Sequence, residues 1–289
     1  MRRRFKQKYG IPVQITRLPG TTLQTRLSAE ETAGTHTGDL VMLSDDPCGF
    51  HAAHPTWIEN FGVKAIPLWP SYTKSAKQYV WKCDDGWSYP VIGIKPWGII
   101  YNTDKVKSPP TWADLASPAF AKHFALPDVR VADAYYDFWS LMLKTYGANF
   151  LTQIANNSKL INGGSAAAQS VAAGEQWATA PTHIGVFAST SANGRAPIAL
   201  TIPSPTVGLE TTAFLLARNL QPHPNAAALF VNYLLSGAGN LQLAGGGGKD
   251  SADGYSIYHL DYLPKNYDAP DHDAAAAAKT QINSLFGLK

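Results

Sequence analysis

The spacing of apolar residues along the chain changes repeatedly, and these changes predict alternating strands and helices. Apolar runs at residues 13–16 and 39–43 predict short strands, with helical sequence between them. The second run is nearly all apolar, as is typical of a parallel strand covered on both faces. Residues 49–62 predict a short helix and a loop. Residues 1–9 have the pattern of the last turns of an amphipathic helix that ends at Gly10.

Two long β-rich runs lie further along the chain. Residues 88–104 read as extended sequence interrupted at 96–98 by Pro-Trp-Gly, which is typical of a strand that passes from one lobe to another. Residues 197–217 form a second run, with prolines and a glycine at its centre. We therefore predict two β crossings between two lobes.

Between and after these runs, the sequence predicts a regular alternation of strands and helices. Thr111 begins a helix with a Thr-x-x-Asp pattern that resembles a capping box. The other predicted elements are a strand at 124–128, helices at 133–147, 148–158, 163–175, 223–237 and 274–287, and a flexible loop at the end of 237–250. This alternation over two segments, joined by two crossings and without internal repeats, predicts a two-lobed α/β protein.

The size and charge of the chain narrow the function classes. Its 289 residues, 45% of them hydrophobic, exceed one ordinary core and suggest two lobes. Five of the 24 Lys and Arg residues lie in the first nine positions, so the remaining 19 face 21 Asp and Glu residues. Because no broad basic field covers the body of the chain, we expect no nucleic-acid partner. No apolar run approaches the roughly 18 residues of a membrane span.

The two cysteines leave alternatives open. Cys48 and Cys83 would pair in an exported protein and remain free thiols in the cytosol, and their spacing does not decide between these. Cys48, His51 and His54 are also spaced three apart, with two aspartates just upstream. On a helix these side chains would drift around one side, where they are candidates to share a metal ion. The alternative is that both histidines are surface residues of a short helix.

Enzyme motifs are largely missing. The Gly-Gly-Gly-Gly-Lys run at 245–249 is followed by Asp250 and has Leu243 where a phosphate loop needs a glycine. The Gly-Gly-Ser-Ala-Ala run at 163–167 lacks the last glycine of a nucleophile elbow. A two-domain enzyme, such as a transferase or a lyase, would need a base and a nucleophile that converge without such motifs.

Candidate binding residues come from polar positions at the ends of predicted elements. Ser44 and Asp45 end the strand at 39–43, in the place where open α/β sheets bind ligands. Gly164 and Ser165 open a helix, and we expect one of them to be its N-cap. Free backbone N–H groups and a positive dipole end at such a helix start would suit an anion.

Aromatic and acidic residues supply further candidates. Trp97, in the first crossing, either stacks on a ligand or fills the gap between lobes. Asp133 and Tyr135 open a predicted helix, where the Tyr135–Tyr136 pair would ligate a metal or line a ligand wall. We nevertheless expect at least one ring of this pair to lie in the core. Glu210, in the second crossing, would meet a ligand amine or hydroxyl, or would be a simple surface carboxylate.

The order of the segments resembles one family along nearly the whole chain. The resemblance rests on FKQKYGIPVQI, GDLVMLSD, WGIIYNTDKV with SPPTWADLASPAF, LPD, NGGSAAAQSVAAGE and HPNAAALFVNYLLS. These segments resemble successive landmarks of the extracellular solute-binding proteins of ABC importers, in the branch with ferric-ion, sugar-phosphate and aminoethylphosphonate binders. The combination of GIIYNTD, TWADL and VAAGE is more specific than any one of them.

The resemblance implies a type II periplasmic-binding-protein fold, in which two α/β lobes close on a ligand by hinge motion. It implies lobe one at 1–97 and 214–265, and lobe two at 98–213 and 266–289. The implied hinges lie near 95–99 and 204–213.

The resemblance also carries site residues over to this chain. Ser44 corresponds to a ligand-side serine, and Gly164 and Ser165 correspond to a helix start that holds the anionic or polar end of the ligand. The crossing from Thr206 to Glu210 corresponds to a hinge-side loop that faces the cleft.

The chain departs from the family in two places. Ferric binders of this branch carry two adjacent tyrosines where residues 181–187 read PTHIGVF, so a ferric ion held by such a pair is not expected. The family's export signal, first strand and a ligand-contacting loop do not precede FKQKYG, so we expect either that the native protein extends upstream or that lobe one lacks its N-terminal strand.

We therefore predict the substrate-binding component of an ABC importer, which acts by binding and not as an enzyme. We expect a periplasmic or extracellular monomer without a cofactor, whose partners are a small polar solute and a membrane permease. An anionic solute, such as a phosphorylated or phosphonate compound, is the first choice, although no Arg falls in the predicted site segments. The alternatives are a cation such as a polyamine, held by Asp45, Asp133 or Glu210, and a metal ion.

Overall fold

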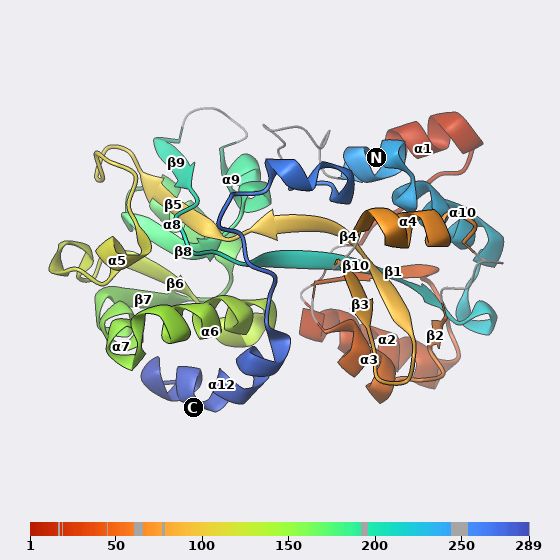
Figure 1. Ribbon diagram of the computed structural model, residues 1–289, viewed down its shortest axis with the longest axis horizontal. Coiled ribbons are helices and arrows are strands. Elements are labelled where there is room, and N and C mark those ends of the chain that lie inside the picture. The colour runs from red at the N-terminus through yellow and green to blue at the C-terminus, as the bar shows by residue number, and fades with distance from the viewer. Residues whose placement is uncertain are drawn as a thin grey trace. The chain divides into compact units, whose positions relative to one another are not determined.

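The computed structural model of the chain, shown in Figure 1, describes residues 1–16, 18, 20–44, 46–60, 66–76, 79–191, 196–243 and 254–288. The chain divides into two compact units. Unit 1 comprises residues 1–94 and 210–262, and unit 2 comprises residues 95–209 and 263–289. The lobe boundaries that we predict from the sequence lie three or four residues later than each of these divisions.

The strands of unit 1 form an antiparallel sheet. Its order is β1 (Leu40–Leu43), β10 (Gly208–Leu216), β4 (Ser88–Pro96) and β3 (Val80–Lys82), while β2 (Ile58–Glu59) also pairs with β10. The prediction of a parallel strand at 39–43 is wrong, because β1 runs antiparallel to β10. Every second residue of β1 is only partly buried, so an almost fully apolar run here does not mean two covered faces.

Six α-helices and two 3₁₀ helices complete the described part of unit 1. They are α1 (Arg2–Tyr9), α2 (Gly20–Ala33), α3 (Pro47–Ala53), α4 (Trp69–Ala76), α10 (Pro224–Leu235), α11 (Gly237–Leu243), η3 (Arg218–Leu220) and η4 (Ile257–Tyr262). The helix predicted to end at Gly10 is confirmed, since Gly10 caps α1 in the left-handed conformation (φ 73°). The strand predicted at 13–16 is wrong: this segment has no regular structure, and no described strand pairs with it.

A disulfide bond in unit 1 joins Cys48 in α3 to Cys83, which directly follows β3. Asp46 caps α3 by accepting a hydrogen bond from the backbone N–H of Cys48 at 2.9 Å. The structure thus decides between the two states that the sequence left open for these cysteines.

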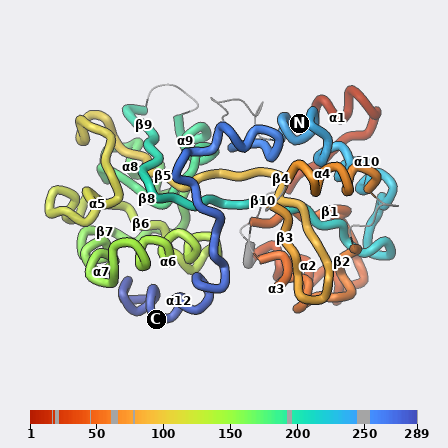
Figure 2. The backbone as a smooth tube through the Cα atoms, in the orientation of Figure 1, coloured from red at the N-terminus to blue at the C-terminus, as the bar shows by residue number. Residues whose placement is uncertain are grey.

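The sheet of unit 2 mixes parallel and antiparallel strands. Its order is β7 (Ser158–Ile161), β6 (Phe124–Pro127), β8 (Ala178–Thr182), β5 (Gly98–Asn102) and β9 (Ile198–Thr201). Strand β6 is parallel to both β7 and β8, whereas β5 is antiparallel to β8 and β9. The tube in Figure 2 shows the helical connections that return the chain from β6 to β7 and from β7 to β8.

The helices of unit 2 begin with the predicted capping box. Thr111 caps α5 (Trp112–Leu115), because its side chain accepts a hydrogen bond from the backbone N–H of Asp114. In return, the carboxylate of Asp114 accepts a hydrogen bond from the backbone N–H of Thr111. The other helices are η1 (Pro118–Phe120), η2 (Val129–Val131), α6 (Ala134–Tyr146), α7 (Ala148–Asn157), α8 (Gly164–Ala172), α9 (Ile184–Thr190) and α12 (His272–Leu285).

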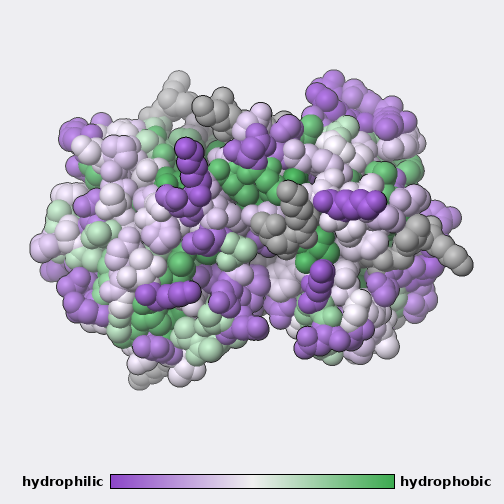
Figure 3. Space-filling view, in the orientation of Figure 1, coloured by the Kyte–Doolittle hydropathy of each residue, from purple (hydrophilic) through white to green (hydrophobic). Residues whose placement is uncertain are grey.

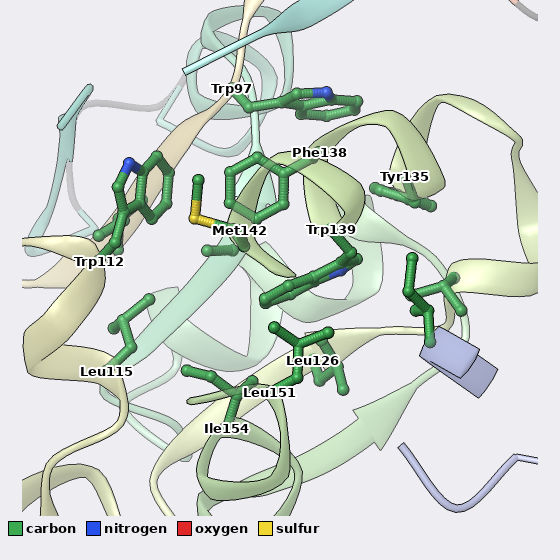
Figure 4. Close-up of a cluster of buried hydrophobic side chains, with 14 of the residues drawn as sticks. Trp97, Trp112, Leu115, Leu126, Tyr135, Phe138, Trp139, Met142, Leu151 and Ile154 are labelled. Atoms are coloured by element: carbon green, nitrogen blue, oxygen red, sulfur yellow. The ribbon is translucent and has the colours of Figure 1, made fainter. Parts of the chain in front are cut away.

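The core of unit 2 is rich in aromatic rings. Trp112, Phe138 and Trp139 are at most 1% exposed and meet edge to face at centroid distances of 4.8 and 4.9 Å. Figure 4 shows these rings together with Trp97 and Tyr135, which lie at the border of the same cluster. The end of the chain takes part in this core, because Phe286 packs edge to face on Trp139 at 4.9 Å.

Two further expectations concern membranes and the 237–250 segment. Among the described residues, no helix is both long and apolar enough to cross a membrane. Residues 237–243 form α11, whereas the loop predicted over the rest of that segment lies outside the described residues.

Candidate functional site

The ends of several strands meet at one edge of the unit 2 sheet. Because β6, β7 and β8 run in the same direction, the chain leaves all three at this edge. Helix α8 begins soon after β7, and α9 begins directly after β8. Strand β5 runs opposite to β8 with Gly98 facing Thr182, so Trp97 enters the sheet at the same edge. Open α/β sheets bind ligands at this edge.

The start of α8 is shaped by two glycines. Gly163 is the N-cap with φ 93°, a left-handed conformation that favours glycine, so the expectation that Gly164 or Ser165 is the N-cap is wrong by one residue. The backbone N–H of Gly164 donates to the Tyr135 hydroxyl. A Cβ atom at Gly164 would lie 2.9 Å from that hydroxyl oxygen, which leaves no room for a side chain.

The side chain of Tyr135 belongs to the site and to the core at once. It is 8% exposed and stacks on Trp97 with a centroid distance of 5.3 Å. Burial raises the pKa of Tyr135 to about 12, against the smaller downward effect of the Gly164 N–H. The hydroxyl therefore keeps its proton at neutral pH. Its oxygen already accepts one hydrogen bond, and its proton has no acceptor among the described residues.

Trp97 is held firmly in place but leaves one donor unused. Its backbone N–H donates to Val207 at 2.9 Å, and its carbonyl accepts the Thr206 hydroxyl at 2.8 Å. Its ring is 2% exposed, yet the indole Nε1–H has no hydrogen-bond partner among the described residues. Leaving such a buried donor unpaired costs roughly 1–3 kcal/mol.

An unpaired indole N–H is not by itself a sign of a site. The Nε1–H of Trp139 is also unpaired, and Trp139 lies between the rings of Phe138 and Phe286 inside the core. Trp97 differs from Trp139 in its neighbours, because it lies against polar groups at the strand ends. These neighbours are the Tyr135 hydroxyl and the imidazole of His183, whose ring centroid is 5.7 Å from that of Trp97.

His183 caps α9 and presents a second donor. Its Nδ1 accepts the backbone N–H of Gly185 at 3.2 Å. Burial, assisted by the positive charge of Lys95, lowers the pKa of His183 to about 3, so the ring is neutral at physiological pH. Because Nδ1 serves as an acceptor, the single proton of the neutral ring is on Nε2. His183 is not among the residues predicted from the sequence; its position directly after β8 was the available signal.

We call the group formed by Trp97, Tyr135, Gly164, Ser165 and His183 the strand-end site. Ser165 is exposed, and the backbone N–H groups of Ser165 and Ala166 have no partner among the described residues. The groups of the site that are still available are thus mainly donors: an indole N–H, an imidazole N–H, a phenol O–H and the N–H groups of a helix start.

Asp133, the acidic candidate of unit 2, is not part of the strand-end site. Asp133 precedes α6 with a side chain that is 61% exposed and forms an ion pair with Lys279 of α12 at 3.0 Å. The ring of Tyr136 is buried beneath Lys279, and its hydroxyl donates to Asn283 at 2.8 Å. Tyr136 therefore links α6 to α12, whereas Tyr135 reaches the strand-end site.

The remaining predicted residues lie in the crossings and in unit 1. Thr206 is 1% exposed, and its hydroxyl holds the Trp97 carbonyl as described above. Ser44 in unit 1 shares a hydrogen bond of 3.1 Å with Thr211. Glu210 is only 9% exposed, so the expectation of a surface carboxylate is wrong: it occupies an inward position of β10. Asp45 lies outside the described residues.

The metal centre considered for Cys48, His51 and His54 does not form. Cys48 is bonded to Cys83, His51 stacks on Trp87 at 3.9 Å and His54 stacks on Trp57 at 3.9 Å. The two histidines thus pack on different indoles. Among the described residues, no three His, Cys, Asp or Glu side chains converge to hold a metal ion.

Solved structures of periplasmic binding proteins share this fold. AfuA from Actinobacillus pleuropneumoniae, with exogenous fructose-6-phosphate bound, is 16% identical with a TM-score of 0.69, over 99% of this chain and 91% of that one. Iron-bound HitA from Pseudomonas aeruginosa is 16% identical with a TM-score of 0.69, over 98% and 94%. The open form of ferric iron-binding protein A from Mannheimia haemolytica is 13% identical with a TM-score of 0.68, over 99% and 92%.

At these identities the likeness shows a common fold, the two-lobed α/β architecture expected from the sequence. No curated protein sequence matches the chain. Residues 52–257 match the family model described as bacterial extracellular solute-binding protein, which is well over half of the chain. The chain therefore belongs to the family of bacterial extracellular solute-binding proteins.

Proposed function

We propose that this protein is the substrate-binding component of an ABC importer, and that its strand-end site holds the anionic group of a small solute for delivery to a membrane permease. The observation that carries the choice of an anion is the set of donors without acceptors at that site. We propose binding and not catalysis as its task, in keeping with its family.

The donors at the strand-end site suit a phosphate, phosphonate or comparable oxyanion. Such groups carry a negative charge and several acceptor oxygens, which can accept hydrogen bonds from these donors. The start of α8 adds N–H groups and the positive end of a helix dipole. His183 takes part as a neutral donor, so its contribution to affinity is constant between pH 5 and 8. Micromolar binding corresponds to about −8 kcal/mol, which several such hydrogen bonds can supply.

A cationic solute finds less support in unit 2. Asp133, the carboxylate proposed for a polyamine, is exposed and already paired with Lys279. Asp128, which follows β6, forms an ion pair with Arg130 at 2.7 Å. Ser44 and Glu210 in unit 1 stay predictions as ligand contacts. A ferric ion is also disfavoured, because the PTHIGVF segment contributes His183 as a helix cap and contains no tyrosine.

The test compares two indole variants in calorimetric titrations and thermal melting of the whole chain. The probes are inorganic phosphate, fructose 6-phosphate, 2-aminoethylphosphonate, spermidine and ferric citrate. Trp97→Phe removes the unpaired N–H of the site and keeps an aromatic ring, while Trp139→Phe makes the same change inside the core. Because a hydrogen bond to a charged group contributes roughly 1.5–3 kcal/mol, Trp97→Phe should weaken binding of an oxyanion probe about 10- to 100-fold.

Trp139→Phe should lower the melting temperature and leave the affinity unchanged. A second pair of variants addresses the helix start: Ser165→Ala removes a hydroxyl, and Ser165→Pro also removes a backbone N–H in the first turn, where proline is tolerated. We expect the larger loss of affinity from Ser165→Pro. Binding of spermidine or ferric citrate alone, or equal affinities of the Trp97 and Trp139 variants, would contradict the proposal.

A further inference from the structure

Helix α1 carries an unusual density of positive charge. Its eight residues include five basic side chains and no acidic one, and all five are exposed: Arg2, Arg3, Arg4, Lys6 and Lys8. Without them, the rest of the chain has an excess of acidic over basic residues. The positive net charge of the protein therefore comes from one short helix.

Among the described residues, contacts between aromatic rings attach this helix to unit 1. Phe5 is fully buried and packs on two rings of α10, edge to face on Phe230 at 4.9 Å and tilted against Tyr233 at 5.4 Å. Tyr9, one turn later, meets Tyr233 at 6.1 Å. Lys8 lies over the Tyr9 ring at 5.2 Å, but the contacts with α10 are made by the aromatic rings, so the basic side chains can be replaced without removing this attachment.

None of the five basic residues of α1 forms an ion pair with a described residue; Lys8 lies over the ring of its neighbour Tyr9, 5.2 Å from the ring centroid. Three basic residues elsewhere do form ion pairs, Arg26 with Glu30, Arg130 with Asp128 and Lys279 with Asp133, at 2.7 to 3.0 Å. Helix α10, on which α1 packs, contains no charged residue. In Figure 3, strongly hydrophilic side chains gather over the position that α1 occupies in Figure 1. Like charges at such density repel one another, and an external anionic surface would relieve that repulsion.

The arrangement of the charges indicates the kind of surface. At 3.6 residues per turn, positions 2, 3, 4, 6 and 8 surround the helix on every side except the one occupied by Phe5 and Tyr9. Positive charge spread around a helix suits a plane of many mobile anions better than a few fixed carboxylates. None of the exposed large apolar residues of the described chain lies in α1, so contact would be electrostatic, without insertion into the bilayer.

We propose that α1 is a docking surface for a membrane rich in anionic phospholipid headgroups, which keeps the protein close to the bilayer. Each basic residue near such a surface strengthens binding roughly fivefold, and the effect falls off within about 10 Å at 0.1 M salt. With three of the five side chains facing the bilayer at one time, the attraction amounts to roughly a hundredfold.

The test is sedimentation of the whole chain with phosphatidylcholine vesicles that contain either no phosphatidylglycerol or about one third of it. One variant replaces the five basic residues of α1 by Gln. The matched control replaces five exposed lysines of unit 2 by Gln, which gives the same net charge: Lys105, Lys107, Lys122, Lys144 and Lys159. Circular dichroism and melting confirm that both variants are folded.

We expect the wild type and the control to bind only the anionic vesicles, with binding lost at 0.5 M salt, and the α1 variant to bind roughly a hundredfold more weakly. Equal binding of the two variants, or no binding of the wild type, would overturn the proposal. If the wild type ignores vesicles but binds polyglutamate through α1, the surface serves an acidic protein partner and the lipid proposal is wrong.

Discussion

The close fit between Gly164 and Tyr135 makes Gly164→Ala an informative perturbation. An added methyl group would lie 2.9 Å from the Tyr135 hydroxyl oxygen, and that hydroxyl accepts the N–H of Gly164 itself. The Tyr135 ring has little freedom to move away, because it is 8% exposed and stacks on Trp97. The substitution should therefore push the hydroxyl off the helix start and break the hydrogen bond.

The expected cost follows from opposing contributions. Loss of the hydrogen bond costs about 0.5–1.5 kcal/mol, and overpacking a fixed site costs about 1–3 kcal/mol. Against these, alanine is better than glycine in a helix by up to about 1 kcal/mol. With the middle of each range of cost and the full gain in helix propensity, the net effect is a loss of about 2 kcal/mol in the free energy of unfolding. Gly237→Ala is the matched control, since Gly237 is the first residue of α11 and a Cβ there meets nothing within 4 Å.

The assay is urea unfolding of the unliganded protein, followed by circular dichroism and by tryptophan fluorescence. Tyr135→Phe removes the hydroxyl and vacates the space that the new methyl needs, so Gly164→Ala should cost almost nothing in the Tyr135→Phe background. The double-mutant cycle should then show a coupling of about 2 kcal/mol, above the roughly 0.5 kcal/mol expected of independent sites. Additive effects, or a Gly164→Ala variant as stable as Gly237→Ala, would refute the contact.

Three further changes test other features of the molecule. Replacing both Cys48 and Cys83 by Ser should lower stability by roughly 4 kcal/mol, because the bond closes a loop between residues 35 apart in sequence; urea midpoints of oxidised wild type and variant measure this, and equal midpoints would contradict it. The pKa of His183 is about 3, so below pH 6.5 its side chain binds a proton in the unfolded chain but not in the native state. The free energy of unfolding should therefore be about 2 kcal/mol lower at pH 5 than at pH 7. An equal loss in His183→Asn, which keeps a helix cap, would refute the assignment. Thr111→Ala should cost about 1 kcal/mol by opening the capping box, and a change below 0.3 kcal/mol in the same assay would argue against it.

Local chemistry explains which features the sequence could predict. The Thr111–Asp114 capping box, the end of α1 at Gly10 and the alternation of strands and helices in unit 2 depend on residues close together in the chain. The start of α8 was placed within one residue, because glycine and serine both fit an N-cap and only the backbone angles separate them.

Other features depend on contacts between distant segments. The pairing of Cys48 with Cys83 requires α3 to lie beside the residue after β3, and no short sequence pattern predicts this contact. The apolar run of β1 is compatible with parallel and antiparallel partners alike. The missing tyrosines of the PTHIGVF segment do not indicate a role for His183, because that role comes from the position where β8 ends.

The discontinuous make-up of the units has a consequence for the order of folding during synthesis. Unit 2 begins at residue 95, yet its core includes Ala275, Ile282 and Phe286 from the last part of the chain. The sheet of unit 1 likewise cannot form before β10 is synthesised, because β10 pairs with β1 and β2. Neither unit can close its core until long after its first strand has left the ribosome, so the nascent chain stays open for most of its synthesis. A chain built in this way stays unfolded, and so able to pass through a narrow channel, for longer than a chain made of two consecutive domains.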